Sequence, residues 1–238
     1  MTSDQILYED NHLLVLNKYA GQLVQGDKTG DTCLAESIKA FLKDRDNKPG
    51  NVFCGVIHRL DRPVSGVCIF AKTSKALSRM NEMVKHHDFQ KTYWAIAKAP
   101  QHLDSSLLTG QKIHLEDWLI RNEKQNKSRV VKPGTPNAKL ASLDYTLLAI
   151  SKGGYVLIEV DLHTGRHHQI RCQLAHAGFP IKGDLKYGYP RSNPDASISL
   201  HARRVVFDHP VRHESTTIEA LPPQDFLKMF GEFIEIKG

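Results

Sequence analysis

A short charged segment between two apolar runs holds the residues whose types and spacing best suit chemistry. His58, Arg59, Asp61 and Arg62 lie within five positions, with Leu60 among them. The runs on either side, 56–57 and 67–70, are typical of short buried strands. Side chains alternate in direction along a strand, so Arg59 and Asp61 would point to the same side near a strand end. A carboxylate beside a guanidinium at such a place is typical of a catalytic or binding site.

The plain alternative for this segment is a surface ion pair, since exposed Asp–Arg pairs are common and weak. Two features favour a site: the apolar runs would bury the flanks, and four charged or titratable residues lie close together. Pro63 lacks an N–H group and should end the first strand near Arg62. Ser65-Gly66 is a turn signal before the second strand.

Composition narrows the class of protein. The 238 residues include 32 Lys and Arg against 26 Asp and Glu, a net charge of +6 that favours a polyanionic partner such as nucleic acid. The N-terminus lacks the features of a signal peptide, and no apolar run approaches the length that crosses a membrane. The cysteines form no C-x-x-C pair, which favours free thiols and a cytoplasmic protein.

The thirteen histidines raise the question of a metal site. No H-E-x-x-H motif or Cys/His ligand spacing is present. The adjacent pairs at 86–87 and 167–168 would point in different directions on a helix or strand. The sequence therefore predicts no metal.

The remaining pattern predicts an α+β fold, with a mixed, mostly antiparallel central sheet flanked by helices and loops. Strands are expected at 6–18 (two, around an Asp-Asn turn), 90–97, 143–150, 155–162, 200–207 and 216–220. Helices are expected at 32–44 with Asp31 as cap, 75–86 with Thr73 or Ser74 as cap, and 224–233. No linker or repeat separates these elements, so one domain spanning 1–238 is expected.

Three further places carry candidate residues, each with a plain alternative. Tyr93 lies on the strand 90–97, where a half-buried structural aromatic is the ordinary interpretation. The stretch 121–132 carries five basic residues, Lys127 and Arg129 among them, and is either a solvated loop or an arm that contacts phosphates. The stretch 164–178 favours a helix capped by Thr164 and ended by Gly178, with a basic face that is either solvated or functional.

Several motifs resemble those of the RluA family of pseudouridine synthases. His58-Arg59-Leu60-Asp61 with Ser65-Gly66 resembles H-R-L-D-x-x-T-S-G, departing at Val64, where the family usually has Thr. Four further segments resemble family motifs in the expected order: 90–93 the K-x-Y motif, 164–171 T-G-R-x-H-Q-I-R, 178–188 G-x-P-I-x-G-D with its following Y-G, and 200–210 the last signature. A second departure is Gln173, where His is more usual, and it is expected to affect packing or RNA contacts and not the chemistry.

The resemblance implies an isomerase that converts uridine to pseudouridine in RNA without cofactor or metal. Asp61 would be the nucleophile, Tyr93 the acid or base for the C5 proton, and Arg171 the cation that keeps Asp61 ionised and oriented. Arg59 would fill the space left by the flipped uridine. The expected RNA contacts are Arg59, Arg62, Arg166, Gln169, Lys127 and Arg129.

The resemblance starts near residue 6, so the chain is expected to be the catalytic domain alone, without the small RNA-binding domain that many relatives carry. The expected partner is ribosomal or transfer RNA. The protein is expected to be a monomer. A non-catalytic RNA-binding protein with the same fold is the first alternative. An unrelated hydrolase that uses Asp61 with a histidine is the second, but it leaves the downstream motifs unexplained.

Overall fold

The computed structural model of the chain describes residues 1–27, 30–101, 103 and 110–233. These residues form two compact units. The first unit is Met1–Gln90 with Ala202–Leu221, and the second is Lys91–His201 with the segment that starts at Pro222. The single domain expected over 1–238 stays a prediction. Among the described helices, none has the length and apolar character needed to span a membrane.

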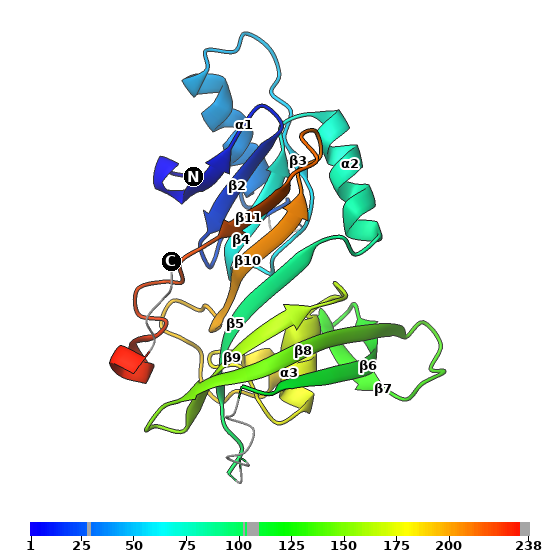
Figure 1. Ribbon diagram of the computed structural model, residues 1–238, viewed down its shortest axis with the longest axis vertical. Helices are drawn as coiled ribbons and strands as arrows, with labels where there is room; N and C mark the ends of the chain where they lie inside the picture. Colours follow the sequence, from blue (N-terminus) through cyan, green and yellow to red (C-terminus); the bar gives the residue numbers. More distant parts are fainter. Residues whose placement is uncertain (28–29, 102, 104–109, 234–238) are drawn as a thin grey trace. The chain divides into compact units, whose positions relative to one another are not determined.

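The first unit is built on strands in the order β1–β2–β4–β10, with β11 beside β10 and β3 beside β4 (Figure 1). The pairs β1–β2, β2–β4, β3–β4 and β10–β11 run antiparallel. Its strands are β1 (Ile6–Glu9), β2 (Leu13–Lys18), β3 (Gly55–Val56), β4 (Ser65–Ala71), β10 (Leu200–Asp208, from Ala202 on) and β11 (Ser215–Glu219). Its helices are η1 (Ser3–Gln5), α1 (Leu34–Arg45) and α2 (Ser74–Lys85).

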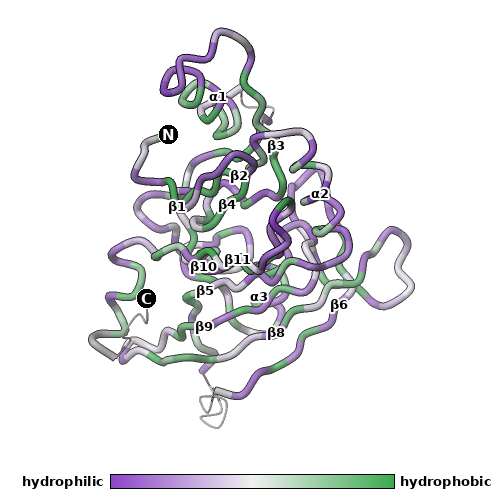
Figure 2. The backbone as a smooth tube through the Cα atoms, turned by 45° about the horizontal axis from the view of Figure 1, so that its top comes forward, coloured by the Kyte–Doolittle hydropathy of each residue, from purple (hydrophilic) through white to green (hydrophobic). Residues whose placement is uncertain are grey.

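The core of the first unit lies around β2 and β4, whose sequences are apolar on both faces. All seven residues of β4 are buried. Figure 2 shows both strands mainly in the hydrophobic colour, whereas α1 alternates between colours as an amphipathic helix does. The Phe89 and Phe207 rings stack with centroids 5.2 Å apart in this core. Burial of this apolar surface is the main force that holds the unit together.

The second unit contains strands in the order β5–β9–β8–β6–β7, and neighbouring strands run antiparallel. Its strands are β5 (Gln90–Lys98), β6 (Lys112–Asn122), β7 (Lys127–Val131), β8 (Lys139–Ile150) and β9 (Tyr155–Leu162). Its helices are α3 (Gln169–His176), η3 (Leu185–Tyr187) and η4 (Lys228–Phe233). The expected hairpin of β8 and β9 is confirmed, as are the α+β class and the mostly antiparallel sheet.

Predictions that depend on residues a few positions apart in the sequence are confirmed. β1 and β2 flank a turn in which the Asp10 carboxylate accepts hydrogen bonds from the amides of His12 and Leu13, each at 2.7 Å. Thr73 caps α2 by accepting a hydrogen bond from the amide of Ala76 at 3.1 Å.

Other predictions, which concern segments in or near the motif at 58–66, are wrong. The first strand stops at Val56, so the segment 58–64 is not a strand and the alternation argument for Arg59 and Asp61 does not apply. Ser65-Gly66 opens β4 and is not a turn. The N-cap of α1 is Cys33, and Asp31 instead accepts a hydrogen bond from Arg62 at 2.8 Å.

Three more differences concern helices and the basic stretch. The helix expected over 164–178 is shorter and begins at Gln169, after His168 in the left-handed conformation. The basic stretch 121–132 is not an irregular loop, because most of it pairs in the β6–β7 hairpin. The last helix is a 3-10 segment that begins at Lys228.

Gly66 is the glycine that the fold of the first unit constrains most. Its φ is 114°, a conformation that residues with a Cβ rarely adopt. A Cβ built there would lie 2.2 Å from the backbone oxygen of Ala202, since β4 runs beside β10. Only glycine permits this close approach between the two backbones.

We expect Gly66→Ala to lower the free energy of unfolding by at least about 3 kcal/mol, because the backbone is strained and the strands must move apart. Urea unfolding measures the change. Gly26→Ala is the matched control, since a Cβ there meets nothing within 4 Å. Equal stability of the two variants would contradict the close approach.

Candidate active site

The segment that carries Asp61 is held in place by a buried lysine. Lys18, at the end of β2, is 0% exposed. Its Nζ donates to the backbone oxygens of Asp61 at 3.3 Å, Arg62 at 3.1 Å and Val64 at 2.6 Å. A further contact joins it to the backbone oxygen of Tyr19 at 3.1 Å. The loop therefore receives from one ammonium group the hydrogen bonds that a neighbouring strand would otherwise supply.

Burial lowers the pKa of Lys18 to about 8, and the nearby Cys68 and Asp61 act in the opposite direction. The Asp61 carboxylate thus stabilises the charge that fixes its own loop. A turn closed by the Val64 amide and the Asp61 carbonyl, at 3.0 Å, shapes the segment further. Asp61 itself is half-buried.

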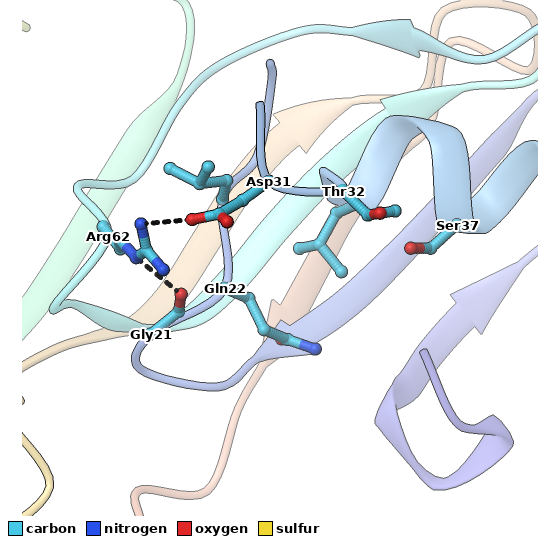
Figure 3. Close-up of a pocket in the computed structure, with 8 residues that line it drawn as sticks. Gly21, Gln22, Asp31, Thr32, Ser37 and Arg62 are labelled. Atoms are coloured by element: carbon cyan, nitrogen blue, oxygen red, sulfur yellow. Dashed lines mark hydrogen bonds and ion pairs between the residues drawn. The ribbon is translucent and has the colours of Figure 1, made fainter. Parts of the chain in front are cut away.

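Arg62 joins this loop to the segment before α1 (Figure 3). Its guanidinium donates to the Asp31 carboxylate at 2.8 Å and to the Gly21 carbonyl at 3.1 Å. Thr32 and Ser37 line the same pocket, which has a volume of about 220 Å³. The Arg62 side chain is 48% exposed, so it remains accessible to a ligand.

The other residues of this loop divide into exposed and buried ones. Arg59 is exposed. Val64 is 2% exposed, so the departure from the family's Thr puts a methyl group in a packed position. The Nε2 atom of His58 accepts a hydrogen bond from the amide of Ile69 in β4 at 3.3 Å. The loop therefore presents Arg59 and Asp61 on a support of buried neighbours.

Tyr93 and Arg171 belong to the second unit, whereas Asp61 belongs to the first. Tyr93 lies on β5 opposite Val160 of β9 and is 7% exposed. Six consecutive residues of β5, including Tyr93, are buried, so the strand is covered on both faces. The alternation expected for a half-exposed strand is absent there.

Arg171 lies in α3 and is 5% exposed. Its Nε and Nη2 atoms donate to the two oxygens of Asp184, at 2.7 and 2.9 Å. Its guanidinium also lies over the Tyr187 ring, 5.1 Å from the ring centroid. A bidentate pair with a buried carboxylate fixes the plane of the guanidinium as well as its position.

Tyr187 connects this pair to the start of α3. Its hydroxyl accepts a hydrogen bond from the Ser128 amide at 2.8 Å and lies 3.0 Å from Nδ1 of His168. The Tyr187 hydroxyl thus contacts both β7 and the residue before α3. Burial and the Arg171 charge lower the pKa of His168 to about 2, so this histidine is neutral.

The loop before α3 is held by Gln169. The Gln169 Oε1 atom accepts hydrogen bonds from the Thr164 hydroxyl at 2.7 Å and the Arg166 amide at 3.0 Å. Its Nε2 donates to the Ser142 carbonyl at 3.0 Å. Gln169 is only 3% exposed, so the geometry favours a supporting role for it. Arg166 is exposed, and its Nε donates to the Leu140 carbonyl at 2.9 Å.

The basic residues of β7 lie on the β6–β7 hairpin. Arg129 is exposed, while Lys127 lies with its Nζ 5.3 Å from the centroid of the Tyr187 ring. Lys127 and Arg129 line a second pocket, with a volume of about 390 Å³. A positively charged strand beside a hollow suits a phosphate backbone.

Sequence reasoning missed three residues of these sites as functional candidates: Lys18, Asp184 and Tyr187. Asp184 and Tyr187 fall inside the motif at 178–188, which was a usable signal. Lys18 gave none, because its partners in the Asp61 segment lie more than forty positions away along the chain.

The comparisons with known proteins agree on one family. The RNA pseudouridylate synthase family matches residues 12–176. The tRNA pseudouridine synthase C of Haemophilus ducreyi is 31% identical over 235 residues, covering 96% of this chain and 95% of that protein. The ribosomal large subunit pseudouridine synthase C of Yersinia pestis is also 31% identical, covering 92% of this chain and 65% of that protein.

A solved structure shares the fold. The human RNA Pseudouridylate Synthase Domain Containing 4 superposes with a TM-score of 0.76 at 23% identity, covering 94% of this chain and 91% of that one. The family match extends from β2 through the Asp61 loop and β5 to the end of α3. The chain belongs to the RNA pseudouridine synthases, isomerases that convert uridine to pseudouridine in RNA.

Proposed function

We propose that this chain isomerises specific uridines in structured ribosomal or transfer RNA, with Asp61 as the nucleophile. The observation that carries the proposal is the Lys18 ammonium, which fixes the backbone of the Asp61 loop inside the matched family region. A reactive carboxylate gains from such support, because a small misplacement of the attacking group is costly in rate.

In the proposed reaction, the bond between N1 of uracil and C1′ of ribose breaks, and uracil rotates. A bond from C5 to C1′ then forms, the C5 proton leaves, and N1 takes up a proton in place of its bond to the ribose. Asp61 attacks or abstracts a proton to start the sequence, and Tyr93 handles the C5 proton. The resemblance to the family implies that these steps need no cofactor.

Arg171 is proposed as the cation that orients Asp61. The supporting observation is the pair with Asp184, which uses Nε and Nη2 and thereby fixes the direction of the whole guanidinium. Asp184 would then be a positioning residue that acts through Arg171. The resemblance of the motif at 164–171 carries the assignment of Arg171 itself.

RNA is proposed to contact the exposed cations Arg59, Arg62, Arg166 and Arg129, together with Lys127. Phosphate contacts of this kind supply most of the salt-dependent affinity for RNA. We further propose a cytoplasmic location and a monomeric enzyme. The four cysteines are free thiols, as a reducing compartment would keep them.

We expect Asp61→Asn to reduce turnover by at least about 10³-fold, because the neutral amide cannot act as nucleophile or base. Release of tritium from RNA labelled at uracil C5 measures turnover, with bulk RNA from cells that lack the gene as substrate. Asp88→Asn, an exposed residue after α2, is the matched control. Release by wild type and Asp61→Asn alike would remove Asp61 from the mechanism, and release by neither would favour a non-catalytic RNA-binding protein.

We expect Asp184→Asn to lower kcat roughly 10-fold to 100-fold while KM changes little, because Arg171 loses the partner that orients it. The variant should also be less stable, since it leaves a buried guanidinium with a weaker partner. Single-turnover tritium release below the variant's melting temperature, with RNA binding measured in parallel, separates the two effects. A folded variant with unchanged kcat would contradict the positioning role.

We expect Arg129→Gln to reduce the slope of log affinity against log salt by about 0.7 to 0.9, the value for one lost phosphate contact. Filter binding to a transfer RNA at several salt concentrations measures the slope. Lys85→Gln, an exposed cation at the end of α2, is the control. If the two variants have the same slope, Arg129 does not contact the backbone.

A further inference from the structure

Two histidines and an aspartate come together on the sheet of the second unit. The Nδ1 atom of His114 lies 2.6 Å from one oxygen of Asp144, and Nε2 of His163 lies 2.9 Å from the other. One ligand atom from each of the three residues lies within 4.8 Å of the others. Asp144 lies 30 positions after His114 and 19 before His163, so no spacing motif could have predicted the cluster.

The strand register explains why the three side chains meet. His114 of β6 pairs directly with Asp144 of β8, and residues opposite each other in this way point to the same face. His163 follows the last residue of β9, next to the Leu143–Leu162 pair. The cluster therefore rests on two neighbouring strands and on the residue that directly follows a third.

The surrounding charges favour a cation. Asp144 lies directly opposite Asp161 of β9, and like charges in this position destabilise a sheet unless they are compensated. Lys112 compensates Asp161 with an ion pair of 2.7 Å. In the described part of the chain, the ion-pair partners of Asp144 are the imidazoles of His114 and His163.

We propose that His114, Asp144 and His163 bind a Zn²⁺ ion, with water as the fourth ligand. Two imidazole nitrogens and one carboxylate oxygen form a donor set that Zn²⁺ prefers. A tetrahedral zinc site places its ligand atoms about 3.4 Å apart, so small rotations of the three side chains suffice. The histidine side chains are 55% and 46% exposed, which leaves room for these rotations and for entry of the ion.

The site is outside the proposed chemistry, but it adjoins the loop that carries Arg166. The amides of His163 and Thr164 both donate to the Ser142 carbonyl, at 3.2 Å. An ion on His163 would fasten the same segment to β6 and β8 by side chains as well as by backbone. Zinc would thus stabilise the second unit and the start of the Thr164–Arg166 loop.

The test uses metal-free protein without an affinity tag. Titration with Co²⁺, followed by visible absorption, reports the coordination geometry, and calorimetry with Zn²⁺ reports stoichiometry and affinity. We expect one ion per chain, a Kd on the order of 1 μM, the intense bands of tetrahedral Co²⁺ and a higher Tm with zinc. His114→Gln, Asp144→Asn and His163→Gln should each weaken binding at least about tenfold, since each removes one of three protein ligands.

His86→Gln is the matched control, because His86 is an exposed histidine 3.6 Å from a single carboxylate, that of Glu82. It should bind zinc as the wild type does. An equal loss of affinity in His86→Gln, or unchanged affinity in His114→Gln and His163→Gln, would overturn the proposal. Absence of binding at 100-fold higher Zn²⁺ than the expected Kd would also overturn it and leave a hydrogen-bonded His–Asp–His network.

Discussion

The segment 58–64 of the first unit, which carries Asp61, depends on hydrogen bonds from the ammonium group of Lys18. Segment 58–64 is not part of a strand, so its carbonyl groups need hydrogen-bond donors from elsewhere. Lys18 provides these donors from the end of β2, whose register with β4 places Lys18 opposite Gly66. The close approach of Gly66 to Ala202 fixes β4 in turn. The position of Asp61 is thus set by strand pairing, through a single buried side chain.

The second unit orients its motif by the same physical means. Arg171 is buried, and a buried charge is tolerated only with a well-placed partner. Asp184 provides it in bidentate geometry, and the Tyr187 ring covers the guanidinium. In each unit, therefore, one buried cation fixes the position of a motif. Burying that cation costs desolvation free energy, which an apolar core would not cost. Such an arrangement is expected where orientation of a polar group matters more than stability.

The sequence predicted those parts of the fold whose signals are local. The β8–β9 hairpin and the Thr73 cap of α2 follow from short-range patterns, and both were correct. The strand expected to reach Arg62 was wrong, because apolar content cannot reveal that the segment finds its donors in Lys18. The helix expected from Thr164 was too long, because the Thr164 hydroxyl is engaged with Gln169 instead of capping it.

The candidate residues Asp61, Tyr93 and Arg171 could be named only through family motifs, and of their supporting partners only Asp184 and Tyr187 fall inside a motif, whereas Lys18 does not. The two departures from those motifs fall among the supporting residues. Val64 fills a buried position of the loop. Gln173 is buried in α3, where its Nε2 donates to Asp117 of β6 at 2.8 Å and its Oε1 is without a hydrogen-bond partner among the described residues. That contact joins a helix to a strand, so the structure places Gln173 in a supporting position, and the expectation that this departure affects packing or RNA contacts and not the chemistry stays a prediction.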